Sequence, residues 1–261
     1  MTEAVLSRSE RYAVPALLAL ILAAWAALWL LDGVHHAHSF SSHSTLDAGA
    51  HSHAHIGPVT RAWAFVGGWL LMTIAMMLPS VLPLVVLFQR LTRTRADAPV
   101  LITLLLAGYL LAYTAYGVIV YMSIALAIPI VGELASGAHP ALLPGCLLLL
   151  AGAFQFSELK ERCLTQCRTP LGFVLRRWNG ARPHWRSLRL GFDHGVFCVG
   201  CCWALMLLMF AVNVASLAWM LLLGAVMAAE KNFRFGRKLT APLGALMLAA
   251  GAALLVKASI A

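Results

Sequence analysis

The sequence contains little charge. Asp, Glu, Lys and Arg make up only 11% of its 261 residues, whereas 61% are hydrophobic. A soluble globular domain has about a quarter of its residues charged and about 45–50% apolar. The composition therefore excludes an ordinary soluble domain and predicts an all-α, polytopic bundle of transmembrane helices. The six cysteines are too few and too scattered for the disulfide framework of a small secreted protein.

Several functional classes lack the residues that they require. The apolar stretches contain no Ser/His/Asp constellation and no paired carboxylates, which argues against a hydrolase. They also contain no pair of histidines, which argues against haem ligation. No internal repeat is visible, so a transporter built from inverted repeats is not supported either.

About seven stretches are apolar enough to be transmembrane helices, which need about 20 such residues. They cover residues 13–31, 62–88, 99–122, 141–156, 191–212, 216–229 and 241–256 of one membrane domain that extends over 1–261. The first stretch is longer than the apolar part of a signal peptide, and no small-x-small cleavage site follows it directly. We therefore expect it to be a retained helix.

The basic residues indicate how the helices are oriented. With the N-terminus in the cytosol, 17 of the 19 Lys and Arg residues fall on the cytosolic side, and only Arg61 and Lys257 fall on the other. Because cytosolic connections carry an excess of Lys and Arg, this predicts an N-in, C-out topology. The net charge of +9 is then explained by insertion and by anionic lipid, and no nucleic-acid partner is expected.

The connection at 32–60, expected outside the cytosol, is rich in histidine. Seven histidines lie within 21 residues: His35, His36, His38, His43, His51, His53 and His55. Neutral imidazole binds Zn, Cu and Ni, and short His-rich tracts are typical of metal binding. The tract is thus either a flexible loop that collects metal or a solvated linker that binds metal incidentally.

The connection at 157–190 is expected to be a basic cytosolic loop, and it contains Cys163 and Cys167. No helix breaker occurs before Pro170, so the fourth helix could continue and place both thiols on one face. The fifth span opens with a second set at i, i+3 and i+4, again on one face: Cys198, Cys201 and Cys202. Both sets lie near the cytosolic leaflet, so five thiols, with His194 close by, are expected at one depth.

Such a thiol set favours a soft metal. Thiolates select Cu(I), Zn(II) or an iron–sulfur cluster, and a cytosolic location keeps them reduced. Met206 on the fifth span, with Met76 and Met77 on the second, favours Cu(I), since thioethers are poor zinc ligands. The alternative is that these cysteines and methionines only fill apolar space. Glu230 is expected to form an interfacial ion pair with Lys231 or a neighbouring arginine.

Four segments together resemble one known family. They read AMMLPS (75–80), LKERCLTQCRTP (159–170), GFDHGVFCVGCCWALM (191–206) and AWM…EK (218–231). The region 62–231 is similar to the DUF2182 family of bacterial integral membrane proteins, described as predicted metal-binding proteins. The resemblance implies a multi-pass protein of the bacterial inner membrane that binds metal, without implying a reaction.

Three functions remain open. The first is copper handling, meaning uptake, delivery or insertion of Cu(I), with a metallochaperone or a membrane-complex subunit as a possible partner. The second is a membrane thiol–disulfide oxidoreductase that uses Cys198 and Cys201 at a helix start, where the dipole lowers a thiol pKa. The third is a structural subunit of a larger membrane metalloenzyme complex. No catalytic residue is assigned.

Overall fold

The computed structural model of the chain describes residues 8–39, 57–135, 142–178, 182–211, 217–233 and 236–260. Within these ranges it contains nine α-helices and no strand, which confirms the all-α class. The helices are α1 (Arg8–Ser39), α3 (Pro58–Thr92), α4 (Ala98–Ala135), α5 (Leu142–Gln155), α6 (Glu158–Arg168), α7 (Pro170–Arg177), α8 (Pro183–Ala211), α9 (Leu217–Asn232) and α10 (Gly236–Ile260).

Five helices are long and apolar enough to cross a membrane, namely α1, α3, α4, α8 and α10. Helices α5 and α6 reach this length only as a pair, and they are bent by 64° at their junction. Counting the pair as one span gives six. Helix α9 has 16 residues, fewer than the roughly 20 that a span needs. Five of the predicted spans thus correspond to helices of sufficient length and apolar character, and the count of about seven stays a prediction.

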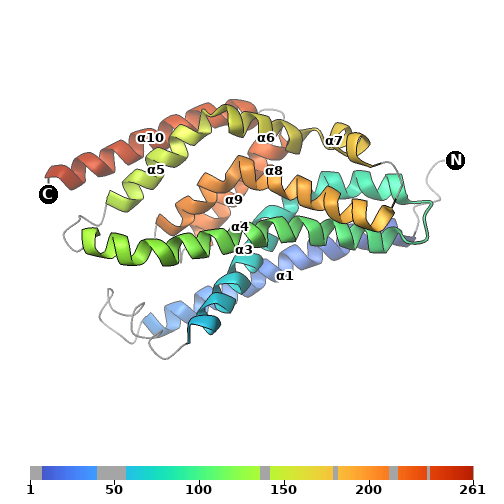
Figure 1. Cartoon of the computed structure of the whole chain (residues 1–261), viewed down its shortest axis with the longest axis horizontal. Helices are drawn as coiled ribbons and strands as arrows, with labels where there is room; N and C mark the ends of the chain where they lie inside the picture. The colour runs from blue at the N-terminus through green and yellow to red at the C-terminus, as the bar shows by residue number, and fades with distance from the viewer. Residues whose placement is uncertain are drawn as a thin grey trace.

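The long helices run side by side along the longest axis of the molecule (Figure 1). Helix α8 packs against α4 over most of its length, α10 packs against α5, and α1 packs against α3. Helix α1 begins at the end of the molecule opposite to the one where α10 finishes. The N-in, C-out topology requires this arrangement, although the side of a membrane on which each end lies stays a prediction.

Two glycines bring the backbones of α4 and α8 into direct contact. A Cβ on Gly191 would lie 1.8 Å from the carbonyl oxygen of Leu105, and one on Gly108 would lie 2.0 Å from that of Leu188. Small residues at helix interfaces allow this close approach in membrane bundles. The contact fixes α8, the helix that carries Cys198, against the longest helix described.

Replacing Gly191 with alanine should therefore destabilise the bundle, even though alanine favours helix more than glycine does. The added methyl overlaps backbone atoms that cannot rotate away, and overpacking of this kind costs about 1–3 kcal/mol. We expect a lower thermal midpoint of the detergent-solubilised protein. Gly68→Ala is the matched control, because a Cβ there meets nothing within 4 Å. Equal midpoints for the two variants would contradict the close α4–α8 contact.

Several helices extend beyond the expected apolar stretches. Helix α1 continues to Ser39, so the start of the segment 32–60 is helical, and α8 begins at Pro183, eight residues before the expected span. The segment 157–190, expected to be a loop, holds α6, α7 and the first turns of α8. Hydropathy detects only the apolar part of a helix, so it misses helical residues that are basic or polar.

The helix predicted at 141–156 corresponds to α5, and it does not continue to Pro170. The lack of a helix-breaking residue before Pro170 suggests that it could. It ends at Gln155, and the side chain of Ser157 accepts a hydrogen bond from the Lys160 backbone N–H at 3.2 Å. Ser at an N-cap satisfies one of the free N–H groups of a helix start. Ser157 therefore starts a new helix, α6, in a different direction, and α6 carries Cys163 and Cys167.

Candidate metal centre

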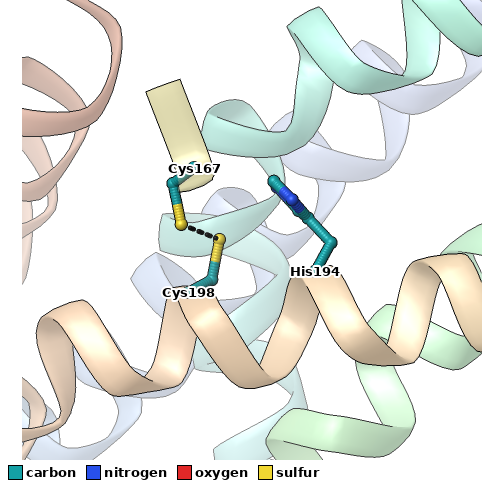
Figure 2. A group of neighbouring side chains, drawn as sticks. All are labelled: Cys167, His194 and Cys198. Carbon is teal, nitrogen blue, oxygen red and sulfur yellow. Dashed lines mark hydrogen bonds between the residues drawn. The ribbon is translucent and has the colours of Figure 1, made fainter. Parts of the chain in front are cut away.

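Three potential metal ligands meet at the contact between α6 and α8. The ligand atoms of Cys167, His194 and Cys198 all lie within 4.8 Å of one another. Figure 2 shows the two thiols facing each other, with their sulfurs 3.3 Å apart, and the His194 ring on the same side of α8. Metal–sulfur bonds of about 2.3 Å place two ligands of one ion at most about 4.6 Å apart. The three side chains are therefore close to the separation that one ion requires.

The local sequence explains this geometry. His194 and Cys198 are four residues apart on α8, so they project from the same face, one turn from each other. Cys167 lies in the last turn of α6, which packs against α8. The Cys198 thiol and the His194 imidazole are buried, and the Cys167 thiol is partly buried. The site is thus formed by two helices, and α8 supplies two of the three ligands.

His194 has an unused polar atom. Its ring is 1% exposed and lies between the rings of Phe173 and Tyr109, at centroid distances of 5.3 and 6.1 Å. Its Nδ1 has no hydrogen-bond partner among the described residues. A buried polar atom without a partner costs about 1–3 kcal/mol. A metal ion bound by this imidazole is one way of satisfying the ring.

The remaining thiols of α8 lie next to this cluster. The Cys201 and Cys202 thiols donate to the backbone carbonyl of Cys198 at 3.1 and 2.9 Å. Cys201 also interacts with Cys167. The Cys202 sulfur lies 3.7 Å from the Tyr113 hydroxyl of α4. Four of the five thiols predicted to converge are thus neighbours.

The other predicted sulfur ligands lie outside the cluster. Cys163 faces Gly200 of α8, where an added Cβ would lie 2.7 Å from its sulfur, and it interacts electrostatically with Cys198 and Cys201. Met206 is fully buried in the apolar core. Met76 packs against Gly224 of α9: a Cβ added to Gly224 would lie 3.2 Å from the Met76 methyl carbon. Their roles as metal ligands stay predictions, and packing in the apolar core remains the alternative for them.

The histidine-rich tract is described only in part. His35, His36 and His38 lie on α1, but their side chains are outside the described part of the chain. His43, His51, His53 and His55 lie outside the described residues. The prediction that this tract binds metal therefore stays a prediction.

Lys231 is the functional candidate that sequence reasoning missed. It was expected to be an interfacial partner of Glu230, but it is 5% exposed and points toward sulfur. Its Nζ lies 3.7 Å from the Met77 sulfur and 3.8 Å from the Cys202 sulfur. It also interacts electrostatically with Cys198 and Cys201. A lysine directly after an apolar stretch was the available signal, because ionisable groups within a bundle are expensive and usually functional.

Glu230 pairs with a different lysine from the one expected. Its Oε2 accepts a hydrogen bond from the Lys160 Nζ at 2.8 Å, and both side chains are almost fully buried, at 2% and 1% exposed. Lys160 also donates to the side-chain oxygen of Gln155. The pair joins α6, which carries Lys160, to α9, which carries Glu230. Glu230 and Lys231 have different partners because adjacent residues of one helix project in different directions. This contact holds the helix that carries Cys167.

The fold and the site together define a bundle of long apolar helices with a buried Cys/His cluster that could hold a metal ion. A family model described as PpoB2, copper chaperone, matches residues 66–254. The match covers well over half of the chain, and the chain belongs to this family of copper chaperones. Neither the curated proteins nor the solved structures gave a match.

The family match bears on two expectations. It confirms the relationship to copper, whereas the resemblance to DUF2182 stays a prediction. The matched region includes all five candidate thiols and His194, and it begins after the histidine-rich tract. The tract and the whole of α1 thus lie outside the matched region.

Proposed function

We propose that the protein is a multi-pass membrane protein that binds Cu(I) through Cys167, Cys198 and His194 and passes it to a partner. The observation that carries the proposal is the approach of the two thiols to 3.3 Å beside a buried imidazole with an unpaired nitrogen. Membership of a copper chaperone family supports copper over zinc or an iron–sulfur cluster. Thiolates are the soft ligands that select Cu(I).

The charges of the site suit a monovalent ion. Two thiolates and one Cu⁺ carry a net charge of about −1, which is expensive in a medium of low dielectric constant unless a cation is nearby. The buried ammonium of Lys231 is 3.8 Å from Cys202 and interacts with Cys198 and Cys201. It thus provides the compensating charge. Copper is here the cargo of the protein and not a resident cofactor.

The wider path of copper belongs to the same proposal. The histidine-rich tract, with His35, His36, His38, His51, His53 and His55, would collect copper outside the cytosol. Met76, Met77 and Met206 would then line a route inward to the cytosolic thiols, including Cys163, Cys201 and Cys202. The N-in, C-out topology in the bacterial inner membrane, on which this direction depends, is part of the proposal.

The test is a Cu(I) titration of the detergent-purified full chain against a coloured chelator under anaerobic reducing conditions. We expect about one tightly bound Cu(I) per chain at the thiol site, measured after chelation of weaker sites. The Cys167→Ser/Cys198→Ser double variant should lose this binding, since hydroxyls are hard, neutral ligands. Cys146→Ser is the matched control, because that cysteine is exposed and outside the cluster. Unchanged stoichiometry in the double variant would reject the site.

A specific observation also favours the second candidate function, thiol–disulfide exchange. The approach of Cys167 and Cys198 to 3.3 Å needs only about 1.3 Å of further movement to reach the disulfide bond length of about 2.05 Å. The pair is not the expected Cys198 and Cys201, whose thiols share one helix. A protein that binds no copper but forms this disulfide reversibly under a glutathione redox buffer would replace the copper proposal with this one.

A further inference from the structure

A basic cavity of about 540 Å³ lies where α7 ends and α8 begins. Five arginines line it, namely Arg176, Arg177, Arg182, Arg186 and Arg189. Of the described lining residues, only Asp193 carries a negative charge, and its Oδ2 already accepts a hydrogen bond from the Arg177 Nε at 3.1 Å. Five positive charges therefore face one negative charge around a space large enough for a small anion.

The arginines are held in position by the fold. The Arg177 guanidinium stacks over the Phe173 ring at 4.2 Å, and Arg186 donates to the Arg177 backbone carbonyl at 3.1 Å. Arg182 has a φ of 46°, a left-handed conformation that is unfavourable for a residue with a side chain. The chain thus keeps an arginine at a position that glycine would occupy without strain. Such strain is typical of residues with a function.

The insertion of helices with positive charge inside does not by itself explain this cavity. That bias counts Lys and Arg alike and needs no common space between them, yet every basic residue that lines the cavity is arginine. The planar guanidinium binds oxyanions through two parallel hydrogen bonds, which the ammonium of lysine cannot do. Five arginines around one space therefore offer the hydrogen-bonding geometry that a phosphate group needs.

We propose that this cavity is a binding site for a phosphate group, either of an anionic phospholipid or of a soluble phosphate. Trp185, which lines the cavity and is 59% exposed, favours the lipid source. Tryptophan is enriched at the level of the lipid headgroups, where its ring is partly apolar and partly hydrated. The site is independent of copper binding, since none of the five arginines belongs to the thiol cluster.

The test compares two probes on the copper-free, detergent-purified full chain. Inorganic phosphate is titrated against chloride at equal ionic strength, and affinity is read from the rise in thermal midpoint. Phosphatidylglycerol, mixed into phosphatidylcholine micelles, is counted as lipid retained on the protein by native mass spectrometry. Arg182→Gln/Arg189→Gln removes two cavity charges. Arg90→Gln/Arg93→Gln removes two exposed charges at the C-terminal end of α3, outside the cavity. Arg189→Lys keeps the charge but loses the paired hydrogen bonds.

We expect both cavity variants to weaken binding of at least one probe about tenfold or more, because each variant removes charge-assisted hydrogen bonds to the phosphate, which are stronger than neutral ones. The α3 variant should change it less than about threefold. Retention of phosphatidylglycerol without an effect of phosphate would assign the site to lipid, and the converse to a soluble phosphate. Equal losses in the cavity and α3 variants, full binding by Arg189→Lys, or binding of neither probe would overturn the proposal.

Discussion

Replacing Glu230 with alanine should destabilise the folded protein by about 3–5 kcal/mol, among the largest effects expected of any single substitution in this chain. The substitution leaves the Lys160 ammonium, which is 1% exposed, without its carboxylate partner. Removing one member of a buried ion pair costs this much because the other charge stays buried without compensation. The measurement is the free energy of unfolding in mixed micelles, or the thermal midpoint where unfolding is irreversible.

A double variant separates this effect from a simple loss of packing. Lys160→Met/Glu230→Leu removes both charges and keeps much of the apolar volume, so it should recover most of the stability lost in Glu230→Ala. As a surface control, Glu158→Ala breaks the exposed pair with Arg162 and should cost less than about 1 kcal/mol. A double variant as unstable as Glu230→Ala would show that the charge of Lys160 is not the cause.

Replacing Lys231 with methionine should weaken Cu(I) binding by about tenfold to hundredfold. The variant removes the positive charge next to Cys202 while it keeps a long apolar side chain. A loss of this size corresponds to roughly 1.4–2.8 kcal/mol, which is the attraction between unit charges about 6–12 Å apart at an effective dielectric constant near 20. The measurement is the anaerobic chelator competition used for the cysteine variants.

Two further variants test whether charge is responsible. Lys231→Arg retains the positive charge and should bind Cu(I) more tightly than Lys231→Met does. Lys257→Met removes an exposed lysine of α10 and should leave the affinity unchanged. If Lys231→Met and Lys257→Met bind Cu(I) equally well, the charge-compensating role of Lys231 is wrong.

The parts of the structure that sequence predicted are those set by short-range patterns. Apolar length located the cores of the five long helices, for example residues 13–31 within α1. The spacing of Cys198, Cys201 and Cys202 placed them on one face of a helix, with His194 close by. The return of the chain to the same side placed Cys167 at a similar depth. The cluster of Cys167 and Cys198 follows from these two arguments together.

The parts that sequence could not predict depend on how helices rotate and cross. Cys163 and Cys167 share a face of α6, but only Cys167 meets Cys198, because Cys163 lies opposite Gly200. The partner of Glu230 is 70 residues away along the chain, and no local pattern marks it. The end of α5 at Gln155 lacks a proline or glycine, and the capping by Ser157 is apparent only once both helices are placed.

The break between α5 and α6 has a consequence for how fast a bound ion leaves. Two ligands are fixed on α8, whereas the third is on a helix of 11 residues that is joined to α5 at a 64° bend. The bend directs α6 toward α8, and the position of α6 determines the effective concentration of the Cys167 thiol near Cys198 and His194. Any movement of α6 that lowers this concentration accelerates dissociation without unfolding α8. If the proposed site binds copper, we expect its residence time to depend on the contacts that hold α6, foremost the Lys160–Glu230 ion pair.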